Sequence, residues 1–95
     1  MIETQELKRA HIFVSGKVQG VFFRRNMRKK AKHFAIFGWV KNLSDGRVEA
    51  VFEGKKQEVE QMIIWARRGP FWAKVNDIDI SWEKYKGEFT CFEVR

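Results

Sequence analysis

The segment spanning residues 16–24 combines residue types that suit the capture of a small anion. Its sequence, Gly-Lys-Val-Gln-Gly-Val-Phe-Phe-Arg, follows an alternating, strand-like run at 11–15 and leads into a helix-like run that begins at Phe22. The glycines relax the backbone, and N–H groups at a helix start have no intrahelical partner and attract negative charge. Arg24 adds a planar guanidinium that matches phosphate oxygens in bidentate fashion. The segment therefore predicts a phosphate-binding loop.

The elements that must position this loop follow from the periodicity of apolar residues. Strands are expected at 9–15, 36–41, 47–53, 75–82 and 89–94, and a first helix at 22–34. A second helix carries an apolar stripe from Val59 to Ala66 and stops at Gly69-Pro70, and Gly54 is expected to end the third strand. Ile78, Ile80 and Trp82 are expected to face inward. The order β-α-β-β-α-β with one further strand predicts an α+β, ferredoxin-like fold, in which two helices cover one face of a mainly antiparallel sheet.

Length and composition indicate one domain, at 9–95, after a short N-terminal tail at 1–8. The net charge is +7, and many of the cations lie between Arg24 and Lys32. A solvated helix face, steering of an anionic substrate and nucleic-acid binding each account for such a cluster. The lack of a long apolar run predicts no membrane span, and the single cysteine, Cys91, fits a reducing cytoplasm.

A second motif, Gly-Trp-Val-Lys-Asn-Leu-Ser-Asp-Gly-Arg-Val-Glu, covers residues 38–49, at the end of the second strand. The two motifs together resemble the two signatures of the acylphosphatase family. The resemblance extends to Trp65, to residues 68–70 and to residues 87–92, so that it spans about residues 9–94. It implies hydrolysis of the carboxyl–phosphate anhydride of acyl phosphates to a carboxylate and inorganic phosphate, without a metal or cofactor.

The resemblance also implies roles for individual residues. Arg24 would bind the phosphoryl group, and Asn42 would orient the attacking water. Main-chain N–H groups of the loop would cradle the phosphate, namely those of Gln19, Gly20, Val21, Phe22 and Phe23. Gln19 is expected to contribute its main chain while its side chain points away.

The chemistry of the reaction agrees with these roles. An acyl phosphate has a good leaving group, so the site must mainly hold the phosphoryl group, neutralise its oxygens and place a water in line. A carboxamide such as Asn42 can hold water through its oxygen and its NH2 group without adding negative charge. The proton of the water is expected to pass to a phosphate oxygen of the substrate.

Other interpretations remain open at this point. Arg24 can be a surface ion-pair partner, and Asn42 can be a turn former before Asp45-Gly46. RNA-recognition modules share this element order, and Phe13, Phe37 and Trp39 are candidates for an exposed aromatic face, although carboxylates on the third strand would repel a phosphate backbone. A non-catalytic acylphosphatase-like module is a third alternative, which the length of 95 residues disfavours. A monomer is expected, with weak association left open.

The remaining polar residues suggest no second centre. His11, His33 and Cys91 lack the spacing of metal ligands, so no metal site is predicted, and Cys91 is expected to be a small core or sheet residue. Glu49 and Glu53 are expected on the open face of the sheet.

Two positions depart from the family pattern. Ala35 stands where the family usually has glycine, which would cost about 1 kcal/mol if a left-handed helix end is kept. Arg25 and Asn26 replace small residues and are expected to enlarge the positive field at the mouth of the site.

Overall fold

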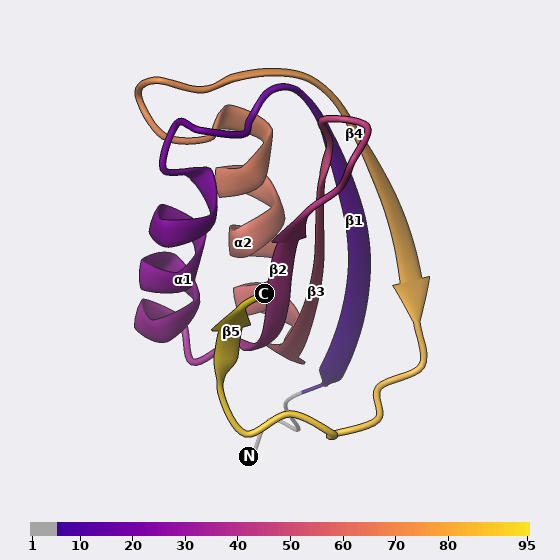
Figure 1. Cartoon of the computed structure of the whole chain (residues 1–95). Helices are drawn as coiled ribbons and strands as arrows, with labels where there is room; N and C mark the ends of the chain where they lie inside the picture. Colours follow the sequence, from indigo (N-terminus) through magenta and orange to yellow (C-terminus); the bar gives the residue numbers. More distant parts are fainter. Residues whose placement is uncertain (1–5) are drawn as a thin grey trace.

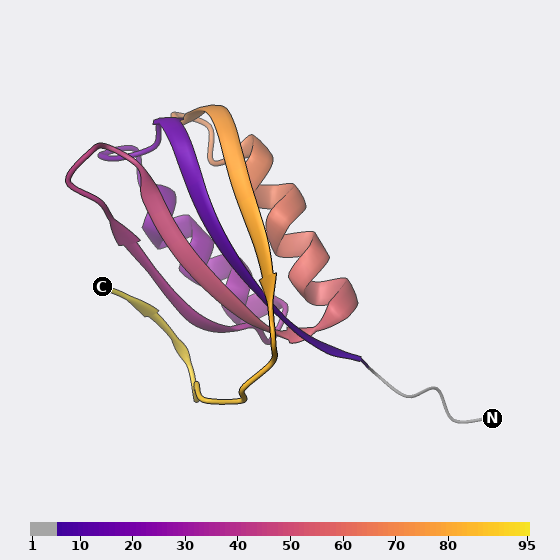
Figure 2. The ribbon, with the colours of Figure 1, turned by 90° about the vertical axis from the view of Figure 1, so that its right-hand side faces the viewer.

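The computed structural model describes residues 6–95, which form a five-stranded sheet with two helices against one face (Figures 1 and 2). The elements are β1 (Leu7–Lys17), α1 (Phe23–His33), β2 (Phe37–Asn42), β3 (Val48–Lys55), α2 (Lys56–Arg68), β4 (Lys74–Glu83) and β5 (Phe92–Val94). The strand order is β4-β1-β3-β2-β5, and every neighbouring pair is antiparallel except β2 and β5. The predicted α+β, ferredoxin-like fold is confirmed.

The hydrophobic core lies between the sheet and the two helices. Ala10, Ile12 and Val14 of β1 are fully buried there, as their alternation predicts, and α1 contributes Phe23 and Met27. Because β1 and β2 are both antiparallel to β3, they run in the same direction, and their C-terminal ends lie at the same end of the sheet. The β1–α1 loop and the β2–β3 turn therefore lie side by side (Figures 1 and 2).

β3 differs from its prediction in length and in burial. Gly54 does not end the strand: it pairs with Lys8 of β1, and a Cβ at this position would lie 2.6 Å from Cδ1 of Ile36. The glycine thus lies in close packing rather than in a turn, and a larger residue here would require the end of the Ile36 side chain to shift. Val51, expected on the open face, is 1% exposed, because its cross-strand neighbours His11 and Trp39 approach each other over it with ring centroids 6.2 Å apart.

The edges of the sheet also depart from expectation. β1 begins at Leu7 because its pairing continues along the longer β3, and residues 1–5 of the expected tail lie outside the described part of the chain. Trp82, expected to face inward, is half exposed near the end of the edge strand β4. β5 is shorter than predicted and starts at Phe92. The prediction for Cys91 is wrong, since its side chain is exposed before that strand.

Helix α1 is followed by a residue in the left-handed conformation, Ala35, although the sequence has alanine there instead of the glycine that usually adopts it. Ala35 has φ 55°, and the N–H of Ile36 donates to the carbonyl of Ala31 at 2.8 Å, which closes the last turn. An alanine in this region costs about 1 kcal/mol because its Cβ approaches the following carbonyl. The chain keeps the glycine-type helix end with a residue that is strained there.

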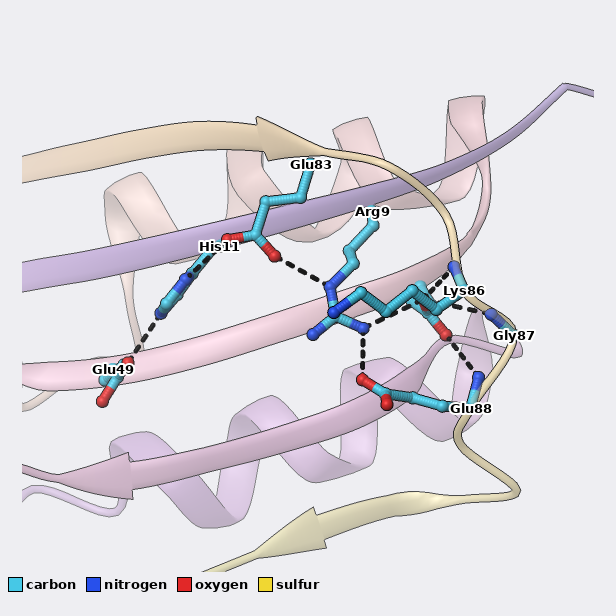
Figure 3. Close-up of polar contacts among 8 residues, drawn as sticks. Arg9, His11, Glu49, Glu83, Lys86, Gly87 and Glu88 are labelled. Atoms are coloured by element: carbon cyan, nitrogen blue, oxygen red, sulfur yellow. Dashed lines mark hydrogen bonds and ion pairs between the residues drawn. The ribbon is translucent and has the colours of Figure 1, made fainter.

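The face of the sheet opposite the helices carries an ion-pair cluster around Arg9 (Figure 3). The Arg9 guanidinium is 9% exposed and contacts Glu53 at 3.1 Å, Glu83 at 2.9 Å and Glu88 at 2.6 Å. Glu53 lies on the open face as expected, but it is only 3% exposed and also accepts a hydrogen bond from the main-chain N–H of Lys86 at 2.9 Å. Burial acts to raise the pKa of Glu53, but the Lys86 N–H and Arg9 outweigh it and lower that pKa. The cluster fastens the segment before β5 onto the sheet.

The aromatic rings of the open face contact cations of the protein itself. Arg47 lies over Phe13 at 4.8 Å, and Arg95 and Lys41 lie over Trp39 at 5.0 and 5.3 Å. Phe13 and Trp39 are half-buried, whereas Phe37 is exposed to solvent. These contacts occupy surfaces on which a nucleic-acid base would stack.

Candidate active site

The loop between β1 and α1 has an unusual backbone conformation. Gly20 has φ 73°, and Phe22, which caps α1, has φ 62° although it is not a glycine. Such strain in a non-glycine residue is typical of functional sites. In the described part of the chain, the main-chain N–H groups of Gln19, Gly20, Val21 and Phe22 donate no hydrogen bond to a protein acceptor. The first turn of α1 contains no acidic residue to compete for them.

Asn26 holds the strained residue of the loop in place. Its Nδ2 donates to the carbonyl oxygen of Phe22 at 2.8 Å, and the N–H of Asn26 donates to the same oxygen at 3.0 Å. The side chain of Asn26 thus acts on the backbone of the loop, a contribution that the sequence did not suggest. Arg25, the neighbour that was expected to enlarge the positive field, is exposed and lines the pocket described next.

Arg24 lies in the wall of a pocket of about 400 Å³ beside the loop. Gly20, Phe22 and Phe23 line the same pocket, so the structure brings the predicted guanidinium together with part of the predicted cradle. Arg24 is half-buried, and its Nη1 donates to the main-chain oxygen of Arg95 at 3.3 Å. In residues 6–95 it forms no salt bridge with an aspartate or glutamate side chain.

Asn42 is the last residue of β2 and has an unusual environment. Its Oδ1 is buried and has no hydrogen-bond partner among the described residues. A buried acceptor without a partner costs about 1–3 kcal/mol, so native proteins rarely retain one without a reason. The carboxamide is therefore not explained by a role in the turn, where its oxygen would accept a local hydrogen bond.

Gln19 ties the loop to the turn that follows Asn42. Its Nε2 donates to the carbonyl oxygens of Leu43 at 2.7 Å and of Arg47 at 2.9 Å, and the Leu43 N–H donates to that Arg47 oxygen at 2.8 Å. The expectation that this side chain points away is wrong. It points into the β2–β3 turn, and its two bonds fix the loop relative to Asn42.

A second connection links Arg24 to the strand that carries Asn42. The N–H of Arg95 donates to the carbonyl of Val40 at 2.8 Å, and the oxygen of Arg95 accepts from Arg24. Val40 precedes Asn42 by two positions in β2. The two predicted site residues therefore belong to one connected end of the sheet, with the loop between them. No sequence signal marked Arg95 as part of this connection.

The described residues contain no group of three or more His, Cys, Asp or Glu side chains placed to hold a metal ion. None of the helices in residues 6–95 has the length and apolar character needed to cross a membrane.

Comparison with known proteins agrees with this geometry. The acylphosphatase family model matches residues 10–94. An acylphosphatase of Pyrobaculum calidifontis is 57% identical over 90 residues, which cover 94% of this chain and 82% of that protein. The structure of an acylphosphatase from Coxiella burnetii superposes with a TM-score of 0.89 at 40% identity, covering 94% of this chain and 93% of the other. That of an acylphosphatase from Bacillus subtilis also gives 0.89, at 32% identity, covering 95% and 99%. The chain belongs to the acylphosphatase family of hydrolases, which act on acid anhydrides.

Proposed function

We propose that this end of the sheet hydrolyses acyl phosphates, with Arg24 and the loop binding the phosphoryl group and Asn42 orienting the attacking water. The observation that carries the proposal is the buried Oδ1 of Asn42, which has no partner among the described residues and precedes a turn that Gln19 ties to the loop. We infer that a small rotation of this carboxamide presents the unsatisfied acceptor to a water molecule. Its neutral charge avoids repulsion of an anionic substrate.

The binding step uses the groups that the protein leaves unpaired. The main-chain N–H groups from Gln19 to Phe23 and the guanidinium of Arg24 supply donors to the three peripheral phosphoryl oxygens. Preorganised donors of this kind stabilise charge that spreads over those oxygens in the transition state. Arg24 is aimed by its bond to Arg95, so little reorganisation is needed when the substrate arrives.

The chemical step then balances without a strong protein base. The water oxygen bonds to phosphorus while the bond between phosphorus and the acyl oxygen breaks, and the carboxylate leaves with the electron pair. The proton of the water passes to a phosphate oxygen, which yields inorganic phosphate. In this scheme the guanidinium of Arg24 balances charge and the carboxamide of Asn42 orients the water, and neither acts as a base.

The proposal also covers the oligomeric state of the protein and its location in the cell. We infer a monomer, because the loop, Arg24 and Asn42 all come from one chain. We also infer a reducing cytoplasm, because the only cysteine of the sequence, Cys91, is exposed. Light scattering on a size-exclusion column tests the first inference, and fractionation of the source cells tests the second.

Hydrolysis of benzoyl phosphate by the purified protein, with and without a chelator, tests the activity. We expect chelator-independent turnover, and a loss of about 10²–10³ in kcat for Arg24→Ala or Asn42→Ala. Lys29→Ala is the matched control, since it removes a cation from the same helix without touching the pocket. Turnover close to wild type in either site variant would remove that residue from the mechanism.

A further inference from the structure

The pocket beside the loop has more cationic groups than one phosphoryl group requires. Arg25 and Arg28 line it together with Arg24. Arg28 is one helical turn from both, at i,i+4 from Arg24 and i,i+3 from Arg25, so the three side chains share one face of α1. Like charges at this spacing destabilise a helix. Concentrated around a cavity, the three guanidiniums give it a positive potential that attracts an anion.

Arg25 and Arg28 lack a carboxylate partner in the described part of the chain. In residues 6–95, no salt bridge involves Arg25 or Arg28, and α1 contains no aspartate or glutamate. Other cations of α1, such as Lys29 and Lys32, do not line the pocket. The arginines that line the pocket thus differ in position from the remaining charges of the helix.

The rest of the pocket fits the body of a small organic molecule. At about 400 Å³ it falls within the range of small-ligand sites and exceeds what a phosphoryl group fills. Its apolar wall comes from Val18, Phe22, Phe23 and Val94. An acyl group that lies against this wall, with its phosphoryl group at Arg24, would extend toward Arg25 and Arg28.

We propose that Arg25 and Arg28 form a second anion subsite, which selects acyl phosphates whose acyl group carries an additional carboxylate or phosphate. This inference rests on the proposed function, since it places the reacting phosphoryl group at Arg24. The planar guanidinium of each arginine binds such a group in bidentate fashion. The interaction is present in both the ground state and the transition state, so it lowers KM and leaves kcat unchanged.

The test compares two substrates of equal shape, 4-carboxybenzoyl phosphate and 4-methylbenzoyl phosphate. The rigid ring prevents the carboxylate from attacking its own acyl group. Wild type is expected to prefer the carboxylated substrate about 3- to 10-fold in kcat/KM at low salt, through KM, because exposed ion pairs are individually weak. The preference should shrink as salt is added.

Paired variants decide whether the preference belongs to these two residues. Arg25→Gln/Arg28→Gln should abolish it without changing kcat for 4-methylbenzoyl phosphate. Lys29→Gln/Lys32→Gln removes the same charge from the same helix outside the pocket and should retain it. Equal use of the two substrates by wild type, or equal loss in both double variants, overturns the subsite.

Binding measurements distinguish a failure of the second anion subsite from a failure of the proposed hydrolytic activity. Calorimetry with 4-carboxybenzylphosphonate and 4-methylbenzylphosphonate, which cannot be hydrolysed, measures the subsite without turnover. If neither acyl phosphate is hydrolysed, the proposed function fails, whereas tighter binding of the carboxylated phosphonate that depends on Arg25 and Arg28 still supports the subsite. Equal binding of the two phosphonates by wild type overturns it.

Discussion

The two hydrogen bonds of Gln19 allow a sharp test of how the loop and Asn42 are held together. Gln19→Met keeps the length and nearly the volume of the side chain and removes only the Nε2 donors to Leu43 and Arg47. Both carbonyls keep a partner within the turn, since Leu43 accepts from Gly46 at 3.2 Å and Arg47 accepts from Leu43 at 2.8 Å. The loss of stability is therefore limited to the net value of the two bonds, about 1–2 kcal/mol.

The effect on activity should be larger than the effect on stability. Without Gln19, the loop that binds phosphate and the turn that carries Asn42 can move independently. A displacement of about 1 Å between reacting groups can cost about 100-fold in rate. We expect kcat for benzoyl phosphate to fall about 10- to 100-fold, with a smaller change in KM, because Arg24 and the loop still bind the phosphoryl group.

Benzoyl phosphate kinetics and urea denaturation on the same preparation measure the two effects. Ile80→Val is a control of comparable instability, because it removes a methylene from a half-buried β4 side chain and typically costs about 0.5–1.5 kcal/mol. It should retain wild-type kinetics. If Gln19→Met loses stability but keeps kcat, Gln19 is only a structural residue and the proposed coupling of loop and turn is refuted.

Three further outcomes follow from single contacts. Asn26→Ala removes the side-chain hydrogen bond to the Phe22 carbonyl, which keeps only the main-chain donor of residue 26, and should raise KM for benzoyl phosphate several-fold. Asn26→Asp, which lacks the donor, should not restore KM, and unchanged kinetics in both variants would contradict the role. Ala35→Gly should raise the free energy of unfolding by about 0.5–1 kcal/mol, because the relief of backbone strain at φ 55° exceeds the added entropy of glycine in the unfolded chain. A lower midpoint of urea denaturation would contradict this. Glu53 has a lowered pKa in the folded state, so its contribution is complete above the ordinary glutamate pKa of 4.5 and is lost as the pH falls from there through the lowered pKa. Glu53→Gln should cost about 2 kcal/mol at pH 7, because it removes a partner of buried Arg9, and less at pH 3; a difference that is independent of pH in urea titrations would refute this.

Local patterns in the sequence determined the order of the elements and the place of the loop. Alternation placed Ala10, Ile12 and Val14 inside, and helical spacing placed Met27 there, because period and burial are coupled in each kind of element. The anion-binding character of segment 16–24 follows from backbone chemistry at a helix start, which is also local. The roles of Arg24 and Asn42 stay predictions, which the variants above test.

Contacts between residues far apart in the chain were decided only by the tertiary structure. Gln19 meets Leu43 across 24 positions, and Arg9 meets Glu53 across 44, because the strand order brings β1, β3 and the β2–β3 turn together. The alternation of side chains along β3 placed Val51 on the open face but did not reveal that Val51 would be buried there. The rings of His11 and Trp39, which come from the two neighbouring strands, cover it. The sequence therefore determined which local structures form and which chemistry they carry. Only the packed sheet decided which side chains hold the loop and the turn in place relative to each other. The reason is that a hydrogen-bond partner depends on distance in space and not on distance along the chain.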